Sequence, residues 1–265
     1  MSNHRNAANM LRFALLASGS KGNATLISDG ETCILQDAGV SRKRLDERLR
    51  QLGVSPASIS AVLVTHEHTD HIRGLPLFAR DFDVPIYATP ATARTIGLHD
   101  TVRVVTFNAG DTLTFGNIRV QSYSVSHDAV DPVNYTYASA AGAKLGFATD
   151  LGHPCKLTLA RLAGSHALIV ESNYCPHMLR RGPYPPFLQQ RIRGRHGHLS
   201  NDDAMALLET LRHDKLRLAV LVHVSEHNND PDLVREKVSR IFAGTPVRIV
   251  VAPPDGLPEW FEVSP

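Results

Sequence analysis

Three histidines and one aspartate occur within six consecutive positions, in the stretch THEHTDH at residues 65–71. Imidazole nitrogens and carboxylate oxygens are ligands that zinc and similar divalent ions accept in proteins. His66 and His68 are two positions apart, so in an extended chain their side chains point the same way. Asp70 and His71 follow, where the chain turns onward. The stretch therefore predicts a metal site with a second ion beside the first.

Further histidines and aspartates follow apolar runs that are typical of β-strands. They are Asp37 after 32–36, His127 after 118–125, Asp150 after 144–149 and His223 after 218–222. In α/β sheets, ligands bind at the carboxyl ends of the strands, where loops converge on a rigid edge. We therefore expect these side chains to join the histidine cluster of 65–71.

The expected ligands divide into two sets that share one carboxylate. One ion is predicted among His66, His68 and His127, and the other among Asp70, His71 and His223, with Asp150 bridging. A set of nitrogen and oxygen donors without thiolate suits Zn²⁺ best, and Mn²⁺ or Fe²⁺ also fits because carboxylates serve harder ions. Asp37 is expected to orient a ligand histidine and not to bind metal itself.

Apolar runs rich in β-branched residues alternate with helix-like stretches, which indicates an α/β fold. No low-complexity linker divides the chain, so a single domain over residues 1–265 is expected. The predicted strands cover 12–18, 23–28, 32–36, 61–65, 85–89, 118–125, 135–139, 144–149, 167–172, 218–222 and 247–251. The predicted helices cover 41–53, 72–82, 155–164, 200–214 and 230–244, and the segment 180–186 is predicted to be a rigid surface loop.

The composition excludes several classes of protein. Hydrophobic residues make up 43% and charged residues 20%, as in ordinary globular proteins. No apolar stretch approaches the ~18 residues that a membrane span requires. The first residues run into a strand pattern instead of a cleavage site, so a cytoplasmic protein is expected. Cys33, Cys155 and Cys175 have no spacing that suggests disulfides or a thiolate metal site.

The HxHxDH motif, followed by His127, Asp150 and His223, resembles the metallo-β-lactamase superfamily. That resemblance implies a four-layer αββα sandwich with a binuclear metal site at one edge of its two sheets. The segments at 17–27, 180–204 and 221–229 resemble the YycJ/VicX (WalJ) branch, whose members are described as double-stranded DNA 5′-to-3′ exonucleases. We therefore expect a binuclear metal-dependent phosphodiesterase that acts on the ends of duplex DNA.

Two divalent ions would make water reactive towards a phosphodiester, and the leaving sugar oxygen would then need a proton. Asp70 counts among the expected catalytic residues because the metal mechanism depends on it. His198 is the candidate proton donor, since it resembles the additional histidine of the tRNA 3′-processing ribonucleases in this superfamily. Glu171 could be its carboxylate partner. The alternative for His198 is a loop histidine that caps a helix.

The segment 177–198 contains five arginines and no acidic residue, although the whole chain has a net charge of only +2. A solvated loop is the simplest interpretation, but near a metal centre such arginines would neutralise phosphates. Expected substrate contacts are Arg191, Arg193 and Arg195, with Ser20 and Asn23 of the SGSKGN stretch facing the cleft. A hairpin turn is the alternative for that stretch. Tyr184 and Phe187 either stack on a terminal base or pack into the sandwich.

Two other functions remain open at this point. One is the hydrolysis of a small molecule, such as a cyclic phosphodiester or another ester or thioester, by the same fold. The other is a non-catalytic protein that metal stabilises and that acts as a regulatory partner. A complete set of seven predicted ligands favours catalysis, because a non-catalytic protein that metal only stabilises has no need of so many.

Overall fold

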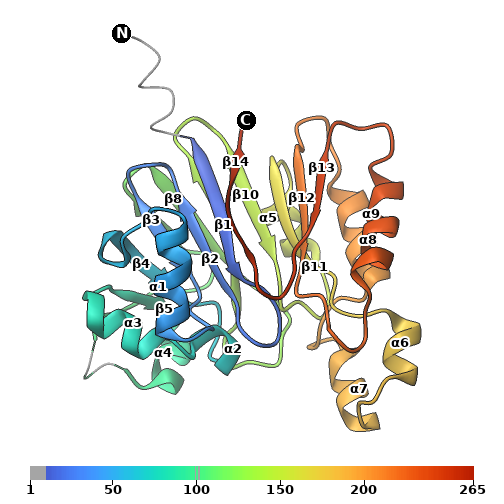
Figure 1. Ribbon diagram of the computed structural model, residues 1–265, viewed down its shortest axis with the longest axis horizontal. Coiled ribbons are helices and arrows are strands. Elements are labelled where there is room, and N and C mark those ends of the chain that lie inside the picture. Colours follow the sequence, from blue (N-terminus) through green and yellow to red (C-terminus); the bar gives the residue numbers. More distant parts are fainter. Residues whose placement is uncertain (1–9, 99, 101) are drawn as a thin grey trace.

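The computed structural model describes residues 10–98, 100 and 102–265. Two seven-stranded sheets pack face to face, and helices cover the outer face of each (Figure 1). The α/β class and the αββα sandwich expected from the sequence are therefore confirmed. In the part of the chain that is described, no helix combines the length and apolar character needed to cross a lipid bilayer.

The first sheet contains both the first and the last strand of the described chain. Its strands are β1 (Leu11–Ala17), β2 (Ala24–Ser28), β3 (Cys33–Gln36), β4 (Ile59–Leu63), β5 (Ile86–Ala88), β6 (Val104–Thr106) and β14 (Leu257–Val263). They lie in the order β14-β1-β2-β3-β4-β5-β6, and β3 to β6 run parallel. The loops that follow β3 and β4 therefore leave from one edge of the sheet.

The second sheet directs four of its strands to a common edge. Its strands are β7 (Thr112–Phe115), β8 (Ile118–Ser124), β9 (Val133–Ser139), β10 (Lys144–Ala148), β11 (Ala167–Glu171), β12 (Leu218–Val222) and β13 (Arg248–Val251). β10 to β13 run parallel, while β8 and β10 are both antiparallel to β9 and so share a direction. The chain segments after β8, β10, β11 and β12 meet at one edge.

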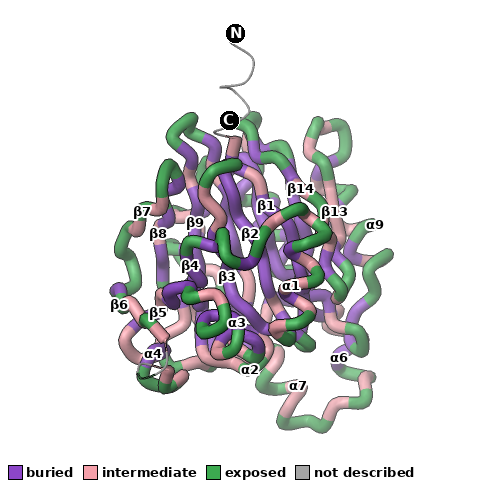
Figure 2. Tube along the Cα trace, turned by 60° about the vertical axis from the view of Figure 1, so that its left-hand side comes forward, coloured by how far each residue is buried: buried purple, intermediate pink, exposed green. Residues whose placement is uncertain are grey.

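Amphipathic helices bury their apolar faces against the outer faces of the sheets. The helices are α1 (Arg42–Gln51), α2 (Thr69–Ile72), α3 (Leu75–Phe82), α4 (Pro90–Ile96), α5 (Lys156–Leu162), α6 (Pro176–Arg181), α7 (Pro186–Ile192), α8 (Asn201–Leu211) and α9 (Pro231–Ile241), with a short 3₁₀ turn at Pro56–Ser58. Helices α1, α3 and α4 pack on the first sheet, and α5, α8 and α9 pack on the second. Figure 2 shows the buried strands in purple between these layers.

Burial of apolar side chains between the layers supplies the main driving force for this arrangement. One core cluster fills the space between the sheets, including Phe13, Tyr135 and Phe261. Two further clusters lie beneath the helices, one under each outer layer. Strands β11 and β12 are buried at every position, as expected for central parallel strands that are covered on both faces. The sheet edge that carries the polar loops is therefore rigid.

The predicted helix 72–82 is wrong at its start. The structure has two helices, α2 and α3, separated near Gly74. The amide of Gly74 donates to the carbonyl of Ala38 at 2.8 Å, and a Cβ at this position would lie 2.1 Å from the carbonyl oxygen of Val40. The chain must turn at this close contact, and Pro76 is tolerated in the first turn of α3.

The segment 180–186 is not a loop throughout. Arg180 and Arg181 end α6, and Pro186 begins α7, because a proline fits the first turn of a helix where its missing N–H is not needed. The short elements α4, α6, α7, β6, β7 and β14 were not predicted. We define residues 176–198 as the α6–α7 arm; its two helices lie below α8 and α9, outside the two sheets (Figure 1).

Candidate metal centre

The segments that follow β4, β8, β10 and β12 bring predicted ligands to one edge. His66 follows β4, His127 follows β8, Asp150 follows β10 and His223 follows β12. All four side chains are at most 6% exposed. Their proximity across the two sheets follows from strand direction, so a small number of rigid elements positions the whole cluster.

The backbone is left-handed at three residues that directly follow strands or lie close behind them at this edge. Asp37, Asp150 and His223 have φ angles of 59°, 50° and 55°. Non-glycine residues adopt this region in only a few per cent of cases, and it costs free energy that the surrounding structure must supply. Each turn ends a strand abruptly and directs the polar side chain into the site. Such strain is typical of functional sites.

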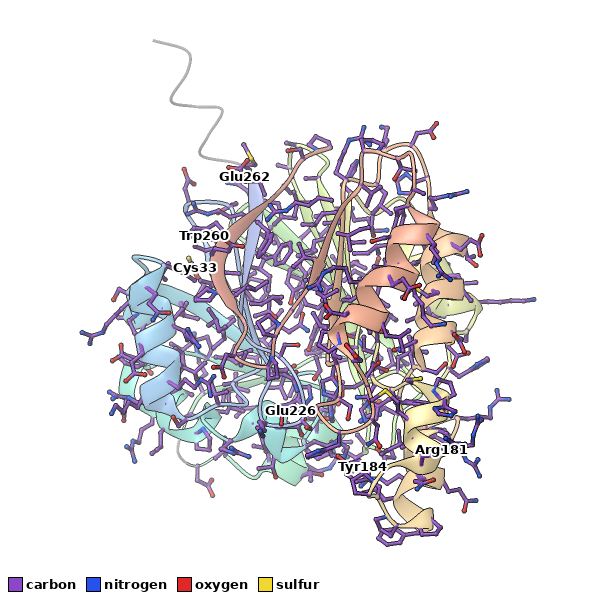
Figure 3. All side chains as sticks on the ribbon, turned by 45° about the vertical axis from the view of Figure 1, so that its right-hand side comes forward. Cys33, Arg181, Tyr184, Glu226, Trp260 and Glu262 are labelled. Atoms are coloured by element: carbon purple, nitrogen blue, oxygen red, sulfur yellow. The ribbon has the colours of Figure 1, made fainter. Side chains whose placement is uncertain are left out.

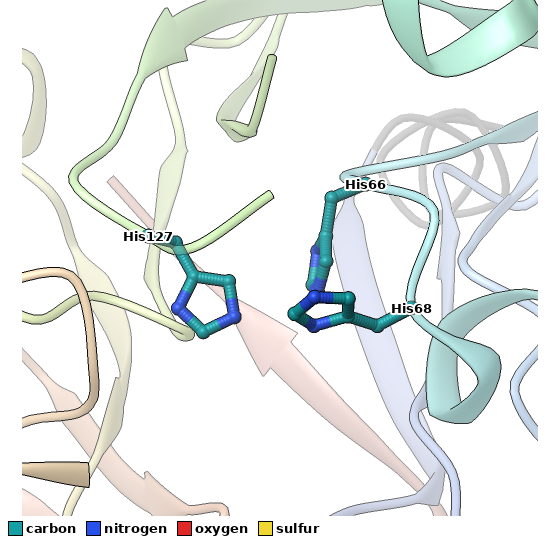
Figure 4. A group of neighbouring side chains, drawn as sticks. All are labelled: His66, His68 and His127. Atoms are coloured by element: carbon teal, nitrogen blue, oxygen red, sulfur yellow. The ribbon is translucent and has the colours of Figure 1, made fainter. Parts of the chain in front are cut away.

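One group of histidines lies on the side of β4 and β8. The ligand nitrogens of His66, His68 and His127 lie within 4.8 Å of one another. Figure 4 shows the three rings gathered from two separate chain segments, with His127 approaching from the opposite side. Their ring centroids are 4.5 to 5.1 Å apart. This group matches the first predicted ligand set.

A second group contains Asp70, His71 and His223, whose ligand atoms also lie within 4.8 Å of one another. Asp150 lies between the groups, because its carboxylate is 3.5 Å from Nε2 of His71 and 3.6 Å from Nε2 of His223. It also belongs to a group with His66 and His71. The structure thus brings together all seven side chains that were predicted to bind metal.

The unpaired atoms of this cluster fit divalent cations. Among the described residues, Nε2 of His66, Oδ2 of Asp150 and Nε2 of His223 are buried and have no hydrogen-bond partner. Leaving a buried polar atom unpaired costs about 1 to 3 kcal/mol. A metal ion accepts such lone pairs directly, and the fold together with these His/Asp clusters indicates divalent ions.

Burial and the carboxylates act in opposite directions on the histidines. Burial lowers the pKa of His66 well below its usual value and also lowers that of His127. Burial opposes protonation of His223 too, but Asp150 and Asp70 outweigh it and raise the pKa of His223 to about 9. Asp150 itself is buried, yet His223 and His71 hold its pKa well below the usual range. The two carboxylates therefore stabilise positive charge at the second group.

Asp37 contacts a predicted ligand from behind. Its Oδ2 lies 2.9 Å from Nδ1 of His71, and it accepts hydrogen bonds from the backbone amide and the hydroxyl of Thr65, each at 2.9 Å. This arrangement fixes the ring of His71 with Nε2 directed at the cluster, as a carboxylate behind a metal-ligating histidine does. Thr65, which the sequence reading did not single out, is part of this support.

Glu171 connects the loop that follows β10 with the segment that precedes α8. It is fully buried, and it accepts hydrogen bonds from the backbone amides of Asp150, Leu151 and Leu199 at 3.2, 2.9 and 2.8 Å. Its Oε2 also lies 3.0 Å from Nδ1 of His198. The predicted partnership of these two residues therefore exists as a contact. Because Nδ1 faces Glu171, Nε2 is the ring nitrogen of His198 left for the pocket.

The residues predicted to bind substrate occupy different places. Ser20 lines the pocket beside the ligands. Asn23 instead contacts Asp70 and His71, at 3.2 and 3.1 Å. Arg191 lines the pocket, but its guanidinium is paired with Asp128. Arg193 and Arg195 are exposed, and neither forms an ion pair with any residue in the described ranges.

Asn173 and Asp128 were missed by the sequence reading. Nδ2 of Asn173 lies 2.8 Å from Nδ1 of His223, so the amide supports this ring from behind. Asn173 follows β11, so the rule about strand ends that selected Asp150 could have found it. Asp128 adjoins His127 and pairs with Arg191, which is 63 positions away. No local sequence signal indicates that contact.

A pocket of about 240 Å³ opens beside the cluster. The predicted ligands His68, Asp70, His127, Asp150 and His223 line one part of it, together with His198. Side chains of the α6–α7 arm line another part. A substrate in this pocket would therefore contact the metal ligands and the arm at the same time.

Comparison with known proteins establishes the family. A family model described as "Beta-lactamase superfamily domain" matches residues 32–224. The exodeoxyribonuclease YycJ of Bacillus anthracis is 37% identical over 236 residues, which cover 88% of this chain and 89% of its own length. The chain belongs to the metallo-β-lactamase superfamily. Within it, the exodeoxyribonuclease WalJ of Streptococcus pneumoniae serotype 2 (strain D39) is 34% identical, with 84% of both chains covered.

These matches confirm the resemblance to the YycJ/WalJ branch. Solved structures agree on the fold of this superfamily member. The metallo-β-lactamase fold protein YhfI of Bacillus subtilis superposes with a TM-score of 0.73 at 16% identity, covering 95% of this chain and 99% of its own. Human tRNase Z, short form, gives a TM-score of 0.65 at 14% identity, covering 96% and 99%. At such identities the likeness extends to the fold alone.

Proposed function

We propose that this protein is a metal-dependent exonuclease that shortens duplex DNA from its ends, in the 5′-to-3′ direction. The observation that carries this proposal is the convergence of seven nitrogen and oxygen donors beside an open pocket, on a chain whose relatives YycJ and WalJ are named exodeoxyribonucleases. We further propose that residues 1–265 form one domain; residues 1–9, 99 and 101 lie outside the described residues. The cytoplasmic location stays a prediction.

The proposed ligands are those of the two histidine groups and the carboxylate between them: His66, His68 and His127; Asp70, His71 and His223; and Asp150. Zn²⁺ is the metal that this donor set suits best, with Mn²⁺ or Fe²⁺ as alternatives. When bound, two divalent ions supply Lewis acids for the phosphoryl oxygens and lower the pKa of a water molecule. Asp37, Asn173 and Asn23 hold ligand side chains in place.

His198 is proposed to donate a proton to the leaving sugar oxygen. It lines the pocket and has one ring nitrogen held by Glu171. The buried carboxylate orients the imidazole through Nδ1, which leaves Nε2 to act as the general acid towards the substrate. Glu171 does not reach the substrate, because it is fully buried, so it acts by positioning His198 and the loop of Asp150.

The arm is proposed to hold the substrate next to these groups. Arg193 and Arg195 are exposed on the segment that leads to His198, so they can approach the phosphates of a nucleic acid. Such contacts neutralise backbone charge and set the register of the strand without reading sequence. Ser20 lines the pocket and could contact the substrate.

The direct test is degradation of DNA by the purified protein loaded with Zn²⁺ or Mn²⁺. The proposal predicts progressive shortening of a linear duplex, no cleavage of a covalently closed circle, and loss of activity after chelation. Label placed at the 5′ or the 3′ end reports the polarity. Nicking of the closed circle at the linear rate would contradict an exonuclease. Cleavage of bis(p-nitrophenyl) phosphate without any action on DNA would support the small-molecule alternative instead.

A further inference from the structure

One wall of the pocket is apolar and has no part in metal binding or proton transfer. It consists of Tyr184, Leu188 and Ile192, which line the pocket together with the predicted ligands. Leu188 and Ile192 are four positions apart on α7 and therefore share one face of the helix. Figure 3 shows Tyr184 on the side of the α6–α7 arm that faces the body of the molecule. These three side chains of the arm therefore border the same pocket as the predicted metal ligands.

Polar contacts, and not burial, hold this wall at a fixed distance from the ligands. No residue of α7 is buried. Arg191 of α7 pairs with Asp128, and the carbonyl of Gly197 lies 3.0 Å from Nδ1 of His127. A Cβ on Gly152 would lie only 2.4 Å from the carbonyl oxygen of Arg195, so the arm backbone rests directly on the loop that follows Asp150. These contacts therefore fix the position of the arm relative to the predicted metal ligands.

Tyr184 is itself held in a defined orientation. Its carbonyl oxygen accepts a hydrogen bond of 2.8 Å from the side chain of Gln189. Its ring lies edge to face with the ring of His227, at a centroid distance of 5.9 Å. A preoriented aromatic ring loses little conformational entropy when a flat ligand stacks on it.

We propose that Tyr184, Leu188 and Ile192 form the binding site for the nucleobase of the terminal nucleotide, whose phosphodiester lies at the metal ligands. This inference rests on the proposed function. The base is the flat, apolar part of a nucleotide, and aromatic stacking tolerates every base because each has a π-face. The pocket volume of about 240 Å³ lies below the range of roughly 300 to 1,000 Å³ typical of ligand sites. From this small volume we infer that the site takes a single base and not a base pair.

The base in this site must leave its partner in the duplex. Unpairing and unstacking a base costs a few kcal/mol, and a mismatched base costs least. A duplex with terminal mismatches should therefore be degraded faster than a fully paired one. The apolar wall supplies the contact that replaces stacking within the duplex.

The test compares two linear duplexes that differ only at their ends. In one, every strand end carries a mismatched nucleotide; in the other, an abasic residue, so neither end residue has to leave a pairing partner. The wild-type protein should remove the abasic end residue about tenfold more slowly than the mismatched one, since base stacking on an aromatic side chain is worth about 1 to 3 kcal/mol. Tyr184→Ala should remove the mismatched nucleotide about tenfold more slowly than the wild-type protein does, and should remove the abasic residue at the wild-type rate. Tyr184→Phe should restore the wild-type rate on both. Leu157→Ala, an exposed leucine of α5, is the matched control.

Three results would overturn the base site. The wild-type protein could degrade both duplexes at one rate, a comparison that needs no variant. Tyr184→Ala could slow both duplexes equally, which would make Tyr184 a structural residue. Terminal mismatches could leave the rate unchanged. If the wild-type protein degraded no DNA at all, the proposed function would fail and the base site with it.

Discussion

The metal centre and the α6–α7 arm contact the same pocket but are built in contrasting ways. Predicted ligands such as His66, Asp150 and His223 are at most 5% exposed and follow buried strands. On the arm, α7 has no buried residue, and Phe187 is 73% exposed (Figure 2). Rigid strand ends suit chemistry, which depends on small distances, whereas an exposed arm suits contact with a large substrate. Changes in the first region should abolish all hydrolysis, and changes in the second should alter substrate preference.

Replacing Asp150 should have the largest effect. Asp150→Asn removes a charge that both ligand groups share, so we expect a loss of at least about 1000-fold in hydrolysis of duplex DNA and of bis(p-nitrophenyl) phosphate alike. Metal content measured by mass spectrometry should fall as well. Asp214→Asn, an exposed carboxylate before β12 at the far end of that strand, is the control. Retention of either activity would show that the carboxylate is not shared.

His198→Ala should separate the two substrates. A general acid contributes roughly 100- to 10,000-fold, so cleavage of DNA should slow by that amount. Hydrolysis of bis(p-nitrophenyl) phosphate should change little, because p-nitrophenolate leaves without a proton. Steady-state rates on both substrates, with metal content unchanged, check this prediction. Equal losses on both would assign His198 to the metal centre instead of to proton transfer.

Glu171→Gln should affect stability as well as rate. The amide group would face donors that now point at a carboxylate oxygen, so we expect a loss of about 1 to 3 kcal/mol in the free energy of unfolding. Urea denaturation measures it, and Glu209→Gln on α8 serves as an exposed control. An unchanged stability would mean that the buried carboxylate does not hold the loops together.

Removing two arm arginines should give the smallest effect and a selective one. Arg193→Ala combined with Arg195→Ala should lower the slope of log affinity against log salt by about two, because each arginine is expected to neutralise one phosphate. Hydrolysis of bis(p-nitrophenyl) phosphate should stay at the wild-type rate. Arg191 is left intact because it pairs with Asp128. If the slope is unchanged, these arginines do not contact the substrate.

The two regions also differ in how far the sequence predicts them. HxHxDH and the polar residues after apolar runs predicted the cluster, because strand direction alone sends Asp150 and His223 to one edge. The arm gave no such signal, since α6 and α7 are six and seven residues long and each begins with a proline. The support of His223 by Asn173 and the pairing of Arg191 with Asp128 join residues 50 and 63 positions apart. Such contacts depend on packing that no local pattern encodes.

A crystal structure of the Mn²⁺- or Zn²⁺-loaded protein, with anomalous scattering measured at the metal edge, tests the central claim most directly. We predict two anomalous peaks on either side of Asp150, one coordinated by His66, His68 and His127 and the other by Asp70, His71 and His223. A single peak, or peaks away from these seven side chains, would contradict a binuclear hydrolase.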